Sequence, residues 1–172
     1  MMQILTRSKF ALALITGVLM MAAVGGLILH ERSKNTLIPA SVQEQISYGV
    51  YLPEDSDIRI QPDSVEFEPQ SKGISYVMQA AKTGDKYTVS QQATPEEFTD
   101  IPEYLPKLIE RMGNYATIDT VLGKVYLTKK QEADSKQIAV MNEKGTLVFV
   151  QADRDLTNNE WRALFKNFQL EK

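Results

Sequence analysis

Residues 74–91 read ISYVMQAAKTGDKYTVSQ, and the fold class follows mainly from these 18 residues. Residues 74–79 and 87–91 are short runs that contain β-branched and aromatic residues, as β-strands do. Lys82–Asp85 (KTGD) lies between them as a turn that is too short to carry a crossover. The two strands are therefore predicted to pair antiparallel.

Two helices are expected where the spacing of apolar residues changes from every second residue to about every 3.6 residues. Thr94–Glu97 (TPEE) combines a hydroxyl cap with a proline and glutamates, and apolar residues then recur at helical spacing across Tyr104–Met112. Near the carboxyl end, Thr157 and Glu160 have the spacing of a capping box. The run Trp161–Phe168 follows with one apolar face, which predicts the clearest helix in the chain.

Further short strands are expected before and after these helices. The economical packing is an antiparallel sheet with helices covering one face. The predicted fold class is therefore α+β, with an N-terminal transmembrane helix followed by an antiparallel sheet covered by two or three helices. The other expected elements are a short helix within 39–45, strands at 46–52, 58–60, 64–68, 117–122, 124–128, 137–141 and 146–151, and a hairpin turn at 142–145.

A long apolar segment precedes this domain. Residues 10–29 read FALALITGVLMMAAVGGLIL, which is 20 residues without a charge. At about 1.5 Å per residue a helix of this length spans about 30 Å, the thickness of the hydrocarbon core. A buried helix of a globular protein would carry a polar stripe. We expect 10–29 to be a transmembrane signal anchor in the lipid bilayer, with a cytoplasmic head at 1–9, a juxtamembrane linker at 30–38 and an extracytoplasmic domain at 39–172.

The sequence around this segment leaves two fates open. Arg7 and Lys9 form a short basic region, and the small residues at 22–26 suit signal peptidase, so cleavage of residues 1–25 would give a secreted protein. Leu27–Leu29 extends the apolar run beyond an ordinary signal peptide, which favours an uncleaved anchor.

The charges on the two sides of the segment set its expected orientation. Arg7 and Lys9 on one side nearly balance Arg32 and Lys34 on the other. Because the head is short and has the form of a signal sequence, we expect a single-pass protein of the cell membrane with its C-terminal domain outside the cytoplasm. Residues 1–34 hold four of the 19 basic and one of the 22 acidic residues, so 35–172 hold 15 and 21, a net charge of −6. That charge disfavours binding to nucleic acid or anionic lipid.

The composition excludes several kinds of chemistry. Without cysteine the chain has no disulfide, thiol nucleophile or thiolate metal site. The single histidine, His30, lies at the expected membrane edge, so the domain has no imidazole base. Ser71 and Lys72 are adjacent, which is typical of a turn and not of a catalytic dyad. No catalytic, cofactor-binding or metal residue is therefore assigned, no cofactor is expected, and the protein is expected not to be an enzyme.

Acidic residues gather at three places: Glu54–Asp57, Glu96–Glu97 and Asp153–Asp155. Paired carboxylates would serve an envelope hydrolase, which is kept as an alternative function. All three groups lie in predicted turns or first helical turns, where capping favours acids. The last group begins a calcium-loop pattern that fails, because Asn158 replaces the glycine and Leu164 the final glutamate.

The aromatic residues suggest a further alternative. On predicted strands or one helix face they would suit a groove for a peptide, glycan or lipid chain, as in a lipid-chain carrier with a half-barrel cavity. A helix packed on a sheet uses the same residues, and this core interpretation is favoured. The residues are Tyr48, Tyr51, Phe67, Tyr76, Tyr87, Trp161, Phe165 and Phe168.

Several segments also occur together in a familiar order: Ile38–Pro39, YGVYLP at 48–53, Tyr87–Gln92 with Thr94–Pro95 and Phe98, and Trp161–Leu170. The arrangement resembles uncharacterised bacterial single-span membrane proteins with one extracytoplasmic domain of unknown function. It is similar to the domain after the membrane helix in some sporulation and anti-sigma-factor proteins. The resemblance implies no catalytic residues, and it implies a non-catalytic protein- or envelope-binding module of the bacterial cell envelope whose partner is unknown.

Overall fold

The computed structural model describes residues 37–54, 57–101, 103–129 and 135–171, which all belong to one unit, Glu31–Lys172. The predicted head at 1–9, the predicted anchor at 10–29 and most of the linker at 30–38 lie outside the described residues. Within the described part, no helix is long and apolar enough to cross a membrane.

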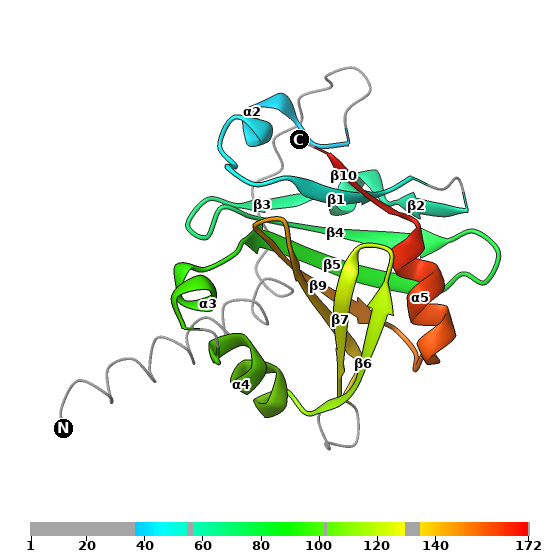
Figure 1. Cartoon of the computed structure of the whole chain (residues 1–172). Helices are drawn as coiled ribbons and strands as arrows, with labels where there is room; N and C mark the ends of the chain where they lie inside the picture. Colours follow the sequence, from blue (N-terminus) through cyan, green and yellow to red (C-terminus); the bar gives the residue numbers. More distant parts are fainter. Residues whose placement is uncertain (1–36, 55–56, 102, 130–134, 172) are drawn as a thin grey trace. The chain divides into compact units, whose positions relative to one another are not determined.

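The main sheet is antiparallel, as the short turns predicted (Figure 1). Its strands are β2 (Ile58–Ile60), β3 (Glu66–Glu68), β4 (Gly73–Ala80), β5 (Lys86–Ala93), β6 (Asn114–Thr120), β7 (Gly123–Thr128), β8 (Ile138–Glu143) and β9 (Thr146–Ala152). They lie in the order β2-β4-β5-β9-β8-β7-β6, and β3 also pairs with β4. The hairpin predicted from 74–91 is β4–β5, with Tyr76 opposite Val89. The α+β class is therefore confirmed.

Helices cover both faces of this sheet, so the prediction that they would cover one face is wrong. They are α2 (Ala40–Gln43), α3 (Glu96–Asp100), α4 (Tyr104–Arg111) and α5 (Asn158–Lys166), with a 3-10 turn η1 (Pro62–Ser64) before β3. In β8, Met141 faces the main core with Trp161 of α5, whereas Val140 faces a second cluster with Ile109 of α4. Successive side chains of a strand project to opposite faces, and an apolar residue on each face requires its own cover.

The closing helix is shorter than predicted, and a strand follows it. The sequence placed Phe168 on the helix face, but α5 ends at Lys166 and Phe168 begins β10 (Phe168–Glu171). This strand pairs antiparallel with β1 (Val50–Pro53) as a separate two-stranded sheet. In β10, Phe168 is buried and Gln169 is exposed. The alternation of apolar and polar residues that is typical of a strand was therefore present at 168–171, but it was not used in the prediction.

Local signals at the helix ends are mostly confirmed. Thr157 Oγ1 accepts a bond from the Glu160 amide at 3.3 Å, and Glu160 Oε2 accepts one from the Thr157 amide at 2.7 Å, which completes the predicted capping box. Gly113 follows α4 with φ +80°, a left-handed conformation that ends helices. Thr94 does not cap α3; its hydroxyl instead donates to Asn142 Oδ1 at 2.5 Å and ties the chain before α3 to β8.

Candidate functional site

The aromatic residues considered for a ligand groove pack into the main core. Tyr51 and Trp161 are 1% and 0% exposed, because the main sheet, the β1–β10 pair and α5 surround them. The core interpretation of these side chains is confirmed. The buried members are Tyr51, Tyr76, Tyr87, Trp161, Phe165 and Phe168, while Tyr48 and Phe67 lie half-buried against the same core.

A buried polar network joins β1 to β4 and β5. The side-chain amide of Gln91 accepts a hydrogen bond from the Tyr51 amide and donates one to the Tyr51 carbonyl, both at 2.7 Å. The Tyr76 hydroxyl donates to the same carbonyl at 2.6 Å. The side chain of Gln91 therefore makes the two hydrogen bonds with the Tyr51 backbone that a neighbouring strand would otherwise make.

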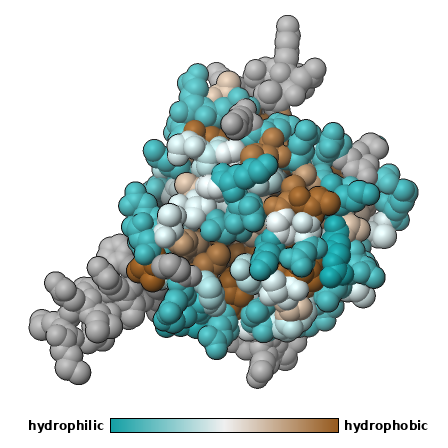
Figure 2. Space-filling model, in the orientation of Figure 1, coloured by the Kyte–Doolittle hydropathy of each residue, from teal (hydrophilic) through white to brown (hydrophobic). Residues whose placement is uncertain are grey.

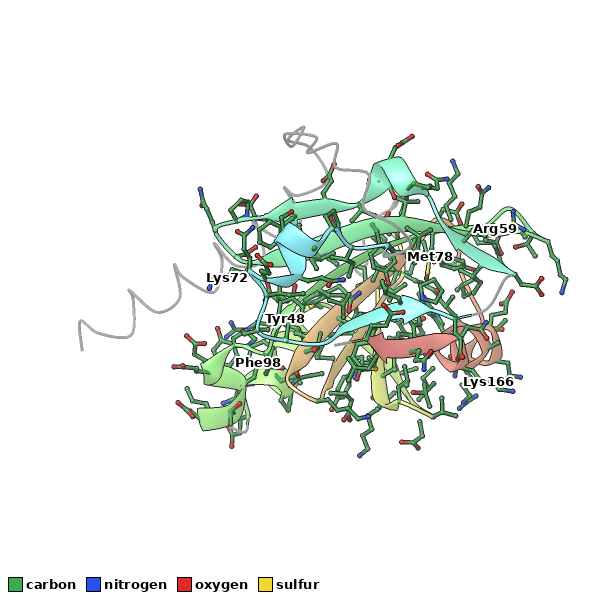
Figure 3. All side chains as sticks on the ribbon, turned by 90° about the horizontal axis from the view of Figure 1, so that it is seen from above. Tyr48, Arg59, Lys72, Met78, Phe98 and Lys166 are labelled. Atoms are coloured by element: carbon green, nitrogen blue, oxygen red, sulfur yellow. The ribbon has the colours of Figure 1, made fainter. Side chains whose placement is uncertain are left out.

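Tyr48 ties the chain before β1 to the same strands. Its hydroxyl lies 2.9 Å from the carbonyl oxygen of Lys72 and 3.0 Å from that of Gln91. Figure 3 looks down on the fold and shows Tyr48 and Lys72 at the same end of it. Burial raises the pKa of Tyr48 to about 12 and raises that of Tyr76 well above its ordinary value. Both hydroxyls thus stay protonated at neutral pH and act as hydrogen-bond donors.

A second buried amide positions the start of α5. Gln137 Oε1 accepts bonds from the Leu156 amide at 2.6 Å and from Trp161 Nε1 at 3.2 Å. Gln137 is 8% exposed, so both donors are satisfied away from water. Sequence reasoning missed this residue and Gln91. For Gln91 the signal was present, because it occupies the inward position of the alternation Tyr87, Val89, Gln91.

The acidic residues considered for hydrolysis lie at exposed turns and helix starts. Asp57 pairs with Lys82, and Asp155 pairs with Lys129 at 2.6 Å. Glu96 and Glu97 form the first turn of α3, where acids interact favourably with the helix dipole. Asp55 lies outside the described residues. Across the described ranges, no group of three or more histidine, cysteine, aspartate or glutamate residues could hold a metal ion.

The Ser71–Lys72 pair forms a turn, as predicted. The Ser71 hydroxyl accepts a bond from the Gly73 amide at 3.2 Å, and Lys72 has φ +52°. Such a side-chain bond two residues along the chain is typical of turns. His30 lies outside the described residues.

Arg154 joins two carboxylates at the start of α5. Its guanidinium donates to both oxygens of Asp85 at 2.9 and 2.8 Å, and to Glu160 Oε1 at 2.8 Å. These bonds hold the pKa of Asp85 below its ordinary value and lower that of Glu160 to about 2. A general acid near neutral pH needs a raised pKa, so neither carboxyl suits that role. We call Arg154, Asp85 and Glu160 the clamp, because their ion pairs join the β4–β5 turn to α5.

Apolar side chains remain partly open around α3 and α4. In the second cluster, four residues are buried and seven apolar residues packed against them are only half-buried. The main core, by contrast, has 25 buried residues and eight half-buried apolar residues packed against them. Ile101, between α3 and α4, is 43% exposed. Figure 2 shows hydrophobic residues gathered beside α4 on this side. We call the following residues the α3–α4 surface: Ile101, Tyr104, Leu105, Leu108, Met112, Tyr126, Ile138 and Phe149.

The α3–α4 surface was not predicted, although the sequence holds a signal for it. Consecutive apolar residues at 138–141 (IAVM) and 147–150 (LVFV) indicate strands with apolar side chains on both faces. The α4 helix then covers only part of the second face, because it has eight residues. Comparison of the chain with protein families, with curated proteins and with solved structures finds no match.

Proposed function

We propose that the protein is a membrane-anchored extracytoplasmic module of the bacterial cell envelope that binds a protein or envelope component without catalysing a reaction. The observation that carries the binding role is the α3–α4 surface, where most apolar side chains of the second cluster are half-buried. Apolar side chains gathered at the surface of a domain are a feature of interaction sites, and Ile101 of this surface is 43% exposed. The anchor is supported by the uncharged run at 10–29.

The polar side chains with the most hydrogen bonds support a non-catalytic role. Gln91 holds β1, Gln137 holds the start of α5, and Arg154 joins α5 to the β4–β5 turn. Each of these groups has a partner that explains its place in the fold. The resemblance to single-span envelope proteins, which implies no catalytic residues, points in the same direction.

The location of the domain can be tested with single cysteines, because the chain has none of its own. Val121, which is 73% exposed, is replaced by cysteine in one variant, and Ser8 in the predicted head is replaced in a matched variant. A membrane-impermeant maleimide added to intact spheroplasts should label Val121→Cys and spare Ser8→Cys until the membrane is permeabilised. The reverse pattern would show that the orientation is wrong.

The binding role is tested with the full chain purified in a non-ionic detergent. Cross-linking in living cells followed by affinity purification should recover a defined protein or envelope polymer at the α3–α4 surface. Hydrolysis of isolated cell-wall material by the purified chain, abolished by Asp155→Asn, would contradict the non-catalytic role and support the hydrolase alternative.

A further inference from the structure

Residues on and beside the two helices of the α3–α4 surface carry a net negative charge. Residues 94–113 hold five acidic and two basic residues, a net charge of −3, which is half of the −6 carried by residues 35–172. Glu103 and Glu110, at the start of α4 and within it, are balanced by Lys107, which pairs with Glu103 at 2.6 Å, and by Arg111. The net negative charge is therefore carried by the three acids of α3, Glu96, Glu97 and Asp100. The five acids all lie exposed on or beside α3 and α4: Glu96, Glu97, Asp100, Glu103 and Glu110.

The strand side of the surface adds no net charge. Lys124 of β7 stands opposite Asp119 of β6 in the strand register, so these two exposed and opposite charges are neighbours. The residues of β7, β8 and β9 that belong to the α3–α4 surface are Tyr126, Ile138 and Phe149. The surface thus combines an apolar centre with a rim that is acidic on one side and balanced on the other.

We infer that the α3–α4 surface binds a cationic amphipathic helix of another protein. The apolar stripe of such a helix would cover Ile101 and Leu105, and its lysine or arginine residues would lie beside the acids of α3. The inference rests on the proposed function, because it names the class of partner for a binding module.

A helix is the form of partner that suits this surface. The surface is made of Ile101, which is exposed, and of half-buried side chains of α4 and of the sheet face, so it offers side chains and not a strand edge to the partner. A helix satisfies its own backbone hydrogen bonds and can bind through an apolar stripe alone. The acidic rim also disfavours an anionic lipid surface as the occupant.

The test measures binding of a fluorescent model peptide to the full chain in phosphatidylcholine nanodiscs. The peptide is a synthetic helix about five turns long with leucine on one face and lysine on the other. A peptide with glutamate in place of lysine is the matched control. The lysine peptide should bind above the level of empty nanodiscs and weaken as salt is raised. The glutamate peptide should not bind, and equal binding of both peptides would overturn the inference.

Two aspartate substitutions separate apolar contact from charge attraction. Ile101→Asp should weaken binding of the lysine peptide about tenfold, although it adds a negative charge. The reason is that the exposed 43% of Ile101 can no longer make apolar contact with the peptide. Val121→Asp adds the same charge at a site 73% exposed on the β6–β7 turn and should change affinity by less than about twofold. Unchanged or tighter binding by Ile101→Asp would overturn the inference.

A second pair tests the rim without changing the apolar centre. Asp100→Asn should weaken binding at low salt by about two- to threefold, while Glu66→Gln on β3, which pairs with β4 away from β6, β7 and β8, should leave it unchanged. Equal effects of the two variants would overturn the acidic rim. Fluorescence of Trp161, which is 0% exposed, reports whether each variant is folded. The two proposals fail separately. A failed cysteine-labelling test would overturn the proposed location of the domain, whereas the peptide-binding measurements alone decide whether the α3–α4 surface binds a cationic helix.

Discussion

Replacing Gln91 with leucine tests whether one buried amide holds β1 on the sheet. In this variant the Tyr51 carbonyl keeps the Tyr76 hydroxyl at 2.6 Å, but the Tyr51 amide loses its acceptor at 2.7 Å. A buried donor without a partner costs about 1–3 kcal/mol. We expect Gln91→Leu to lower the free energy of unfolding by about 2 kcal/mol.

Two comparisons set the scale of this loss. Tyr76→Phe removes a hydroxyl that donates to the Tyr51 carbonyl and accepts a long bond from Gln91 Nε2 at 3.3 Å. The Tyr51 carbonyl still accepts from Gln91 Nε2 at 2.7 Å and the Tyr51 amide keeps its acceptor, so the cost should be smaller, about 1 kcal/mol. Gln92→Leu is the matched control, because Gln92 is half-buried and points to the opposite face. It should change stability by no more than about 0.5 kcal/mol.

The measurement is urea unfolding of the full chain in a non-ionic detergent, followed by fluorescence of Trp161, the only tryptophan. A loss of about 2 kcal/mol corresponds to a midpoint about 1 M lower in urea. Hydrogen exchange of the Tyr51 amide gives a local readout and should become faster in Gln91→Leu before the rest of the core is affected. Equal stability of Gln91→Leu and Gln92→Leu, with unchanged exchange at Tyr51, would refute the reasoning.

Three further predictions concern α5 and its surroundings. Gln137→Leu removes the acceptor of two buried donors, including Trp161 Nε1, and should cost about 2–4 kcal/mol in urea unfolding and shift the tryptophan emission; an unchanged spectrum would contradict this role. Thr157→Ala breaks the capping box and should cost about 1 kcal/mol, while Thr157→Ser should cost less, so equal losses would argue against the cap. The folded-state pKa of Glu160 is about 2, below its ordinary 4.5, so its stabilising contribution is complete above pH 4.5 and is lost as the pH falls towards 2. Arg154→Gln should raise that pKa and flatten the loss in acid unfolding curves, and an unchanged slope would contradict the clamp.

Much of the architecture was predictable from local pattern. The β4–β5 hairpin follows from two strand-like runs joined by a short turn, and the start of α5 follows from the Thr157–Glu160 spacing. These signals are readable because they depend on residues close in the chain. The end of α5 was not predicted correctly, since Phe168 continues the apolar spacing of the helix and also begins the alternation of β10.

The candidate surface was less predictable than the core. An apolar residue such as Phe149 indicates burial, but the sequence does not say how much of a sheet face a helix will cover. That depends on where α4 lies over β7, β8 and β9. The exposure of Ile101 could not be predicted from the sequence, because isoleucine is among the residues that are most often buried.

By itself the sequence determined the α+β class, the antiparallel hairpins, the helix cap and the absence of thiol and imidazole chemistry from residues 35–172. Only the tertiary structure decided that β1 pairs with β10, that Gln91 and Gln137 supply partners to buried backbone groups, and that helices cover both faces. The physical reason is that period and capping are set by neighbouring residues. Strand pairing between the two ends of the domain, and the cover of each sheet face, depend on contacts between residues far apart in the chain.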